Sequence, residues 1–213
     1  MISEPSTGPR TGPHTPQPPN HHAHYPKFHG VSGVLAALSM AFARGASTSV
    51  AIELSDLQSS DRLIDIGCGP GAPARVAAKQ VRSVVAIDPA PIMLRVARLI
   101  PSKSNIEWSL GRAEATGVAD ESATAVWALA TVHHWSDLER SVQEVLRVLR
   151  PNGRMIAIER RVRADARGHA SHGWTVEQGR AYAKQCLAVG FSSAEMLERS
   201  VGDESFVAVR AVR

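Results

Sequence analysis

The sequence has 213 residues, of which 44% are hydrophobic and 5% aromatic, and its two cysteines are Cys68 and Cys186. This length predicts one domain with a substantial core, and so few cysteines exclude a disulfide scaffold or a cysteine-based zinc site. The net charge of +4 is spread along the chain, so we expect no nucleic-acid partner. We interpret the densest basic cluster as a solvated loop; it consists of Arg160, Arg161, Arg163 and Arg167.

The N-terminal segment differs in composition from the rest of the chain. Residues 1–26 are Pro, Thr, Gly and His with almost no aliphatic residues, so we expect a flexible arm followed by a single domain over residues 27–213. The close spacing of His21, His22, His24 and His29 is interpreted as incidental. No stretch reaches the roughly 18 apolar residues of a membrane span and no signal-peptide core is present, so we expect a cytoplasmic protein without a membrane partner.

Strands alternate with helices along the remaining sequence. Apolar residues recur at helical spacing over residues 31–57, with a break near Gly45. Expected strands span residues 62–66, 84–87, 105–110, 124–131 and 154–159, and expected helices span 73–80, 91–100, 138–149 and 175–190. The last of these helices is expected to begin with a capping box from Thr175 to Gln178 and to end at Gly190. A final strand pair spans 195–200 and 205–212, the last alternating as an antiparallel edge strand does. This order predicts an α/β fold with a doubly wound, mostly parallel sheet and helices on both faces.

A glycine-rich loop follows the first expected strand. That strand ends at Asp65, and Gly67, Gly69 and Gly71 follow before Pro73 opens a helix. Alternating glycines allow positive φ angles and leave no side chain between the backbone and a ligand. We therefore interpret this loop as a ligand-binding turn, against the simpler alternative of a structural turn without a ligand.

Two ligand classes suit such a loop. The spacing of Gly67, Gly69 and Ala72 satisfies the dinucleotide fingerprint, so an NAD-type ligand stays open. A pyrophosphate, however, seeks backbone N–H donors, whereas a carboxylate stands at the strand end and prolines remove two donors. Asp65 instead favours S-adenosylmethionine, which brings a cationic ammonium and a sulfonium.

Several motifs taken together resemble a known family. D-I-G-C-G-P-G at 65–71, V-V-A-I-D-P at 84–89, the stretch 111–137 ending in V-H-H-W-S-D, and L-R-P-N-G at 149–153 resemble the class I S-adenosylmethionine-dependent methyltransferases, in particular the small branch called methyltransferase type 11. The resemblance covers about residues 61–159. It implies a Rossmann-like sheet with an antiparallel C-terminal strand, S-adenosylmethionine as cofactor and S-adenosylhomocysteine as product. It also suggests that residues 25–30 fold over the cofactor.

The expected cofactor contacts follow the strand ends. Asp88 lies at the interval from the glycine loop at which an acid meets ribose hydroxyls, although it also suits a helix cap. The resemblance implies that the residues just after Asp88 and those near residue 113 also contact the cofactor. The complete expected set is Asp65, Gly67, Cys68, Gly69, Gly71, Asp88, Pro89, Ala113, Glu114 and Leu129. Two departures from the family pattern are Arg112, where an aspartate is usual, and Thr124, where an acid is common.

Two adjacent histidines follow the fourth expected strand. Ligands in such sheets lie at the carboxyl ends of the strands where the strand order reverses, which places His133 and His134 near the methyl group. A hydroxyl acceptor must lose a proton, and histidine is the commonest base, so either residue is a candidate catalytic base. Glu159, closing the fifth strand, is an alternative base or cofactor contact. In the simpler reading the histidines only bond backbone groups, and Trp135 packs in the core.

The acceptor is inferred from the segment over residues 160–174. It is short and polar, and it contains His169, His172 and Trp174. Few aromatic residues disfavour a flat aromatic acceptor, so we expect a small-molecule acceptor rich in hydroxyls, such as a saccharide. The chain is also similar in size to actinobacterial sugar O-methyltransferases. No acidic cluster indicates a magnesium site, so we predict no metal.

Alternatives remain for the function. A quinone, a phenol or another small metabolite is a second class of acceptor, and an NAD-dependent oxidoreductase or a non-catalytic cofactor-binding protein is a different class of function. A monomer and a homodimer are both compatible with the sequence.

Overall fold

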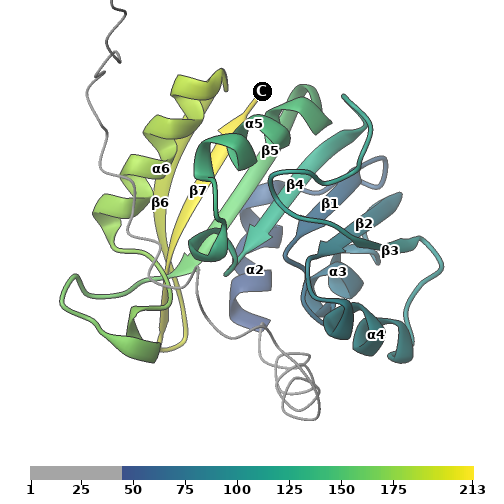
Figure 1. Ribbon diagram of the computed structural model, residues 1–213, viewed down its shortest axis with the longest axis horizontal. Coiled ribbons are helices and arrows are strands. Elements are labelled where there is room, and N and C mark those ends of the chain that lie inside the picture. The colour runs from purple at the N-terminus through teal and green to yellow at the C-terminus, as the bar shows by residue number, and fades with distance from the viewer. Residues whose placement is uncertain (1–44) are drawn as a thin grey trace, which may run out of the picture.

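The computed structural model describes residues 45–213, apart from the side chain of His169 (Figure 1). The expected arm, its histidines and the expected helical residues before Gly45 lie outside this range. Seven strands in the described part form one sheet in the order β3-β2-β1-β4-β5-β7-β6. The strands are β1 (Arg62–Ile66), β2 (Ser83–Asp88), β3 (Ile106–Leu110), β4 (Ala123–Leu129), β5 (Leu149–Arg160), β6 (Ser193–Val201) and β7 (Glu204–Val212).

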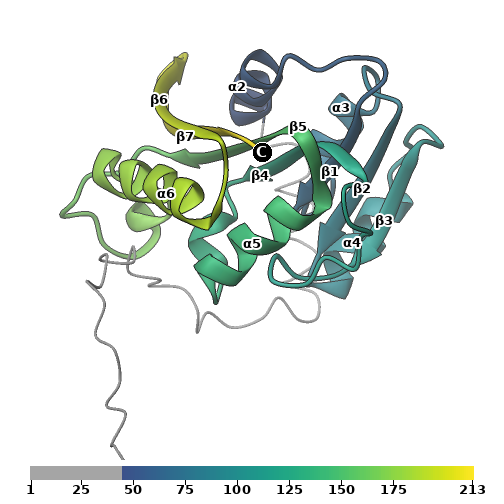
Figure 2. The same ribbon diagram turned by 90° about the horizontal axis from the view of Figure 1, so that it is seen from above.

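Helices cover both faces of this sheet, as predicted. They are α2 (Gly45–Ser55), α3 (Ala72–Ala77), α4 (Pro91–Leu99), α5 (Leu138–Val148) and α6 (Val176–Val189), with short 3₁₀ turns η1 (Val132–His134) and η2 (Gly168–Ser171). Figure 2 shows α2 and α3 on one side of the sheet and α5 and α6 on the other. Leu94 of α4 packs in the same core cluster as α2 and α3.

The sheet is parallel except at β7, which runs antiparallel to both β5 and β6. The predicted doubly wound sheet with an antiparallel C-terminal strand is therefore confirmed, but the expectation that β7 is an edge strand is wrong. Val207 and Val209 pack on the α6 face, whereas Phe206 and Ala208 pack on the α2 face. Because β7 pairs with β5 on one side and with β6 on the other, β6 is the edge strand.

Helix ends agree with the sequence signals more closely than strand starts do. Thr175 and Gln178 form the predicted capping box of α6, and Asp137 caps α5 by accepting from the N–H of Arg140. Helix α3 is shorter than predicted, because it ends at Ala77.

The start of β5 is also a correction. The strand begins at Leu149 rather than Arg154, because the chain turns straight from α5 into the sheet. Asn152 at φ +63 allows the bend, and its N–H donates to the carbonyl of Arg213.

None of the helices between residues 45 and 213 is long and apolar enough to cross a bilayer.

A partly buried ionic cluster fixes the loop that follows β3. Glu144 of α5 accepts from the N–H and the hydroxyl of Thr116, at 2.8 and 2.6 Å, and pairs with Arg147 at 2.7 Å. Burial alone would raise the pKa of Glu144, but the hydrogen bonds from Arg147 and Thr116 outweigh it and lower this pKa from 4.5 to about 2. The folded chain therefore stabilises the ionised form of Glu144 relative to its protonated form.

We expect Glu144→Gln to lower the free energy of unfolding at pH 7 by about 2 kcal/mol, equivalent to about 4–8 °C in melting temperature. A lowered folded-state pKa stabilises the fold above the unfolded value, and this stability is lost as pH falls. The free energy of unfolding should therefore differ from that of the wild type by the full amount above pH 4.5, and this difference should disappear towards about pH 2. Urea unfolding at a series of pH values measures it.

Glu139→Gln on the exposed side of the same helix is the control, and it should change stability little. A Glu144→Gln deficit that persists unchanged below pH 3 would contradict the assignment.

Candidate active site

The strand order reverses between β1 and β4, and the loops after these two strands meet there. The glycine loop follows β1, and Thr131 with η1 follows β4. A Cβ atom added to Gly67 would overlap the side chain of Thr131, so the two loops are in contact. The predicted juxtaposition of the glycine loop and the histidine pair at the carboxyl ends of the strands is thus present in the structure.

The three loop glycines are required for different reasons. All have left-handed φ angles, +70° at Gly67, +55° at Gly69 and +82° at Gly71. A Cβ at Gly71 would overlap the ring of Trp108 on β3, just as one at Gly67 would overlap Thr131, whereas a Cβ at Gly69 would meet nothing within 4 Å. Of the three, Gly69 is therefore where a ligand has open space beside the backbone. The contact of Gly71 with Trp108 was not predictable from the sequence, because the loop after β1 and strand β3 lie far apart in the chain.

Two buried carboxylates flank this loop. Asp88, 7% exposed at the end of β2, accepts from the N–H of Gly69 and from the N–H of Ala90, both at 2.8 Å. It therefore holds the glycine loop and the turn before α4, but it does not cap that helix, whose N-cap residue is Ala90. Asp65 at the end of β1 is 1% exposed. Two acids at this edge favour a cationic ligand over a pyrophosphate.

The remaining predicted cofactor residues lie around the same edge. Cys68 is buried in the core, and its thiol donates to the carbonyl of Gly69 in the loop at 3.4 Å. Pro89 is exposed, while Ala113 and Leu129 are buried. Their contacts with a cofactor stay predictions.

Glu114 has a structural role that the sequence did not indicate. Its Oε1 accepts from the hydroxyl of Ser136 at 2.7 Å and from the N–H groups of Ser136 and Asp137 at 3.0 and 3.2 Å. Burial opposes ionisation, but these hydrogen bonds lower the pKa of Glu114 overall. Glu114 thus ties the loop after β3 to the start of α5, and its expected cofactor contact stays a prediction.

His133 is held by Glu159. The Nδ1 atom of His133 lies 2.8 Å from Oε2 of Glu159, and the backbone N–H of His133 donates to Oε1 at 3.3 Å. Glu159 is only 1% exposed. Two of the three candidate bases predicted from the sequence are therefore one unit, in which the carboxylate orients the imidazole. The pairing of Leu129 with Ile158 explains this contact, because it places Glu159, near the end of β5, beside the loop that carries His133.

A third histidine joins the pair from a distant segment. The ring centroid of His172 lies 5.5 Å from that of His133 and 5.9 Å from that of His134. The two adjacent rings have centroids 3.9 Å apart. The sequence placed His172 only in a polar segment, and no spacing rule connects it to the pair.

Two tryptophans expected near the site belong to the core. Trp135 packs on Tyr182 with ring centroids 6.4 Å apart, which confirms core packing. Trp174 is 1% exposed and lies 4.9 Å from the same ring. The expectation that Trp174 edges the acceptor site is wrong, because its indole is covered by α6.

The basic cluster over residues 160–167 is mostly engaged within the chain. Arg160 donates to the carbonyls of His172 and Ala170, at 3.3 and 3.0 Å. Arg161 pairs with Glu198, and Arg163 with Asp165. These partners agree with a solvated loop.

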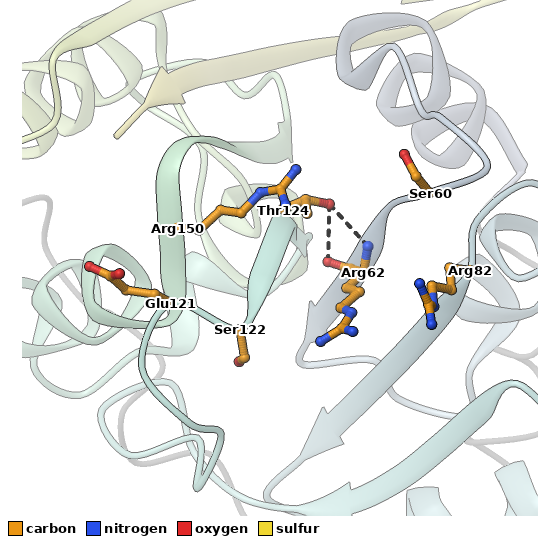
Figure 3. A pocket seen from close by; sticks show the side chains of 7 residues that line it. All are labelled: Ser60, Arg62, Arg82, Glu121, Ser122, Thr124 and Arg150. Carbon is orange, nitrogen blue, oxygen red and sulfur yellow. Dashed lines mark hydrogen bonds between the residues drawn. The ribbon is translucent and has the colours of Figure 1, made fainter.

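A separate pocket lies at the opposite, amino-terminal edge of the sheet (Figure 3). Its lining includes Arg62, Arg82 and Arg150. The hydroxyl of Thr124 donates to Asp61 at 2.5 Å and accepts from the N–H of Arg62 at 3.0 Å. This threonine, a departure from the family pattern, thus joins the starts of β1 and β4 far from the glycine loop.

Comparisons with known proteins agree with this geometry. Residues 64–157 match the family model described as a methyltransferase domain. A crystal structure of an S-adenosylmethionine-dependent methyltransferase from Aquifex aeolicus superposes with a TM-score of 0.69, covering 84% of this chain and 97% of that one at 15% identity. The chain has the Rossmann-like fold of methyltransferases.

Two curated relatives share sequence with this chain, and the structure of one of them is known. YcgJ of Bacillus subtilis, named an uncharacterised methyltransferase, is 28% identical over 121 residues, 55% of this chain and 48% of its own length. Its crystal structure superposes with a TM-score of 0.61 over 78% of this chain and 97% of that one. The 27-O-demethylrifamycin SV methyltransferase of Amycolatopsis mediterranei is 34% identical over 104 residues, 46% of this chain and 38% of its own length.

The sequence matches thus span about half or less of these relatives. Together they support an S-adenosylmethionine-dependent methyltransferase, and S-adenosylmethionine rather than NAD as the ligand of the glycine loop.

We expect Gly67→Ala to lower the melting temperature by more than the strain of a left-handed backbone alone explains. Gly117 has φ +74 with open space around an added Cβ, so Gly117→Ala isolates the conformational cost of about 1–2 kcal/mol, or about 2–8 °C. Gly67→Ala adds the overlap with Thr131 and should lower the melting temperature further. It should also weaken S-adenosylhomocysteine binding in calorimetry, which Gly117→Ala leaves intact. Equal effects of the two substitutions would contradict a packed contact between the loops.

Proposed function

We propose that this protein is an S-adenosylmethionine-dependent methyltransferase that methylates a hydroxyl group of a small acceptor, with a saccharide as the favoured class. The observation that carries the proposal is the His133–Glu159 pair at the carboxyl ends of β4 and β5, on the same edge of the sheet as the glycine loop after β1. One edge of the sheet thereby holds a binding loop for the donor and a basic group for the acceptor. Residues 27–213 are proposed to act as one catalytic domain.

The residues at this edge fit the donor. Asp65 and Asp88 supply negative charge beside the loop, and Gly69 leaves open space next to its backbone. Asp88 already receives two N–H donors, and each carboxylate oxygen accepts more than one hydrogen bond, so ribose hydroxyls can join them. When bound, S-adenosylmethionine supplies an electrophilic methyl group.

His133 is the proposed base. With Nδ1–H donating to Glu159, the basic nitrogen of this tautomer is Nε2, where the proton of an acceptor hydroxyl would be received. Glu159 stabilises the imidazolium that forms and fixes the ring plane, so that the acceptor is oriented as well as activated. His134, exposed beside it, is the second candidate base.

The acceptor class follows from what lines this edge. Among the described residues, His134 is exposed there, whereas Trp135 and Trp174 are buried, so an imidazole faces solvent at this edge and the two indoles do not. This supports a hydroxyl-rich acceptor over a phenol or a quinone. The relative named for 27-O-demethylrifamycin SV also supports transfer to oxygen.

Purified protein incubated with S-adenosylmethionine should form S-adenosylhomocysteine and a methylated product with members of a saccharide panel, and more slowly with phenols. Mass spectrometry of both products measures this. S-adenosylhomocysteine at a hundred times its dissociation constant should stabilise the fold by about 2.7 kcal/mol, while NAD should not. Turnover restricted to phenols would overturn the acceptor class, and stabilisation by NAD alone would overturn the methyltransferase.

Glu159→Gln should lower kcat by about 100-fold to 10,000-fold, because the amide cannot stabilise the imidazolium. The affinity for S-adenosylhomocysteine should remain unchanged, which distinguishes loss of the base from loss of the fold. Glu195→Gln, an exposed acid on β6, is the matched control and should keep full activity. A Glu159→Gln protein with the wild-type kcat would contradict the base and favour a structural role for the pair.

A further inference from the structure

Three imidazoles converge at the acceptor side of the site. One ring nitrogen from each of His133, His134 and His172 lies within 4.8 Å of the others. The first two come from the turn after β4, and the third from the segment between β5 and α6. The prediction of no metal rests on the lack of an acidic cluster, whereas this cluster consists of imidazole nitrogens.

The backbone that carries His172 is fixed from several sides. Arg160 donates to the carbonyl of His172 at 3.3 Å, and its own carbonyl accepts the N–H of Trp174 at 2.9 Å. A Cβ on Gly173 would overlap the Arg160 carbonyl, so glycine is required for this close approach. Trp174 anchors the segment in the core. The third imidazole is therefore held in place next to the other two.

The remaining contacts match those of a metal ligand set. Histidines that bind metal commonly direct their second ring nitrogen to a carboxylate, which fixes the tautomer and raises the basicity of the ligand. His133 does this with the buried Glu159 at 2.8 Å. His134 is exposed, so an ion and a further ligand can reach the cluster from solvent. Three imidazoles suit Zn²⁺ and similar divalent transition metals, and they do not suit Mg²⁺.

We propose that His133, His134 and His172 form a binding site for a divalent transition-metal ion, with Zn²⁺ as the reference ion. Glu159 is the residue that orients His133 towards it. Three protein ligands leave at least one coordination position for an oxygen atom from outside the chain. An acceptor hydroxyl bound there would be acidified by the ion, so the ion would take over from the imidazole base in the loaded protein. Ion binding is independent of the proposed function, but this use of it rests on that function.

The test measures ion binding directly in the full-length chain. Because His14, His21, His22, His24 and His29 can bind metal on their own, all variants are made in a background where these five are Gln. After chelation, Zn²⁺ is titrated by calorimetry, and Co²⁺ is titrated by visible absorption, which reports the coordination geometry. The background protein should bind one equivalent of ion.

The variants distinguish a residue that binds the ion directly from one that only orients a ligand. His172→Ala should weaken Zn²⁺ binding by at least about 100-fold, and Glu159→Gln by about 10-fold to 100-fold. Ser171→Ala, next to His172 in the same segment, keeps the three imidazoles and should bind like the background protein. Circular dichroism and melting temperature check that each variant is folded.

Two results would overturn the site: no saturable Zn²⁺ binding by the background protein, or equal affinity in His172→Ala. Both outcomes are independent of methyl transfer. If Zn²⁺ binds as described but no acceptor is methylated, the metal site stands and the proposed function fails. If methyl transfer proceeds in a chain that binds no ion, the function stands and the metal site fails.

Discussion

The parallel pairing of β1 with both β2 and β4 is the constraint on which the site depends. Asp65 pairs in register with Ala86 on one side and Trp127 on the other, so three strands end at one edge. The glycine loop, Asp88 and the histidine turn each follow one of these strand ends. Residues far apart in the sequence therefore meet because the strands run the same way, and the contact between Gly67 and Thr131 shows how closely the loops approach.

The carboxyl edge of the sheet holds buried acids. Asp65, Asp88 and Glu159 are buried at or beside the carboxyl ends of the strands, whereas the pocket at the amino ends is lined by charges of both signs, Arg62, Arg82 and Arg150 with Glu121 (Figure 3). Buried carboxylates are costly unless they receive hydrogen bonds, and Asp88 and Glu159 receive theirs from backbone N–H groups and from an imidazole. The acids at the carboxyl edge suit the cationic donor of the proposed function.

Much of the fold was predictable because its signals are local. The run ending at Asp65, the capping box at Thr175 and the glycine at 190 each act within a few residues, and each is confirmed. The exceptions depend on distant partners. The position of β7 inside the sheet follows from the edge strand β6 beside it, and the early start of β5 follows from its bend at Asn152 and the contact with Arg213.

The site follows the same rule. The glycine loop and the histidine pair are recognisable from short motifs, whereas the contacts of His133 with Glu159 and His172 are not. The contact with Glu159 depends on the register of β4 on β5. The contact with His172 depends on the path of the segment that Arg160 and Gly173 hold in place. No periodicity in one sequence encodes either contact.

Glu159 links stability and chemistry in this arrangement. A carboxylate that is only 1% exposed is tolerable because His133 donates to both of its oxygens, once through the ring and once through the backbone. The imidazole is thus positioned by the requirement to satisfy a buried acid, whatever reaction the protein catalyses. The same bond determines which ring nitrogen faces the acceptor, so the requirement that keeps the core satisfied also prepares the nitrogen that a proton or a metal ion would bind. Because Glu159 lies at the end of β5, next to the turn after β4, it can both accept the hydrogen bonds that a buried acid needs and orient the imidazole of His133.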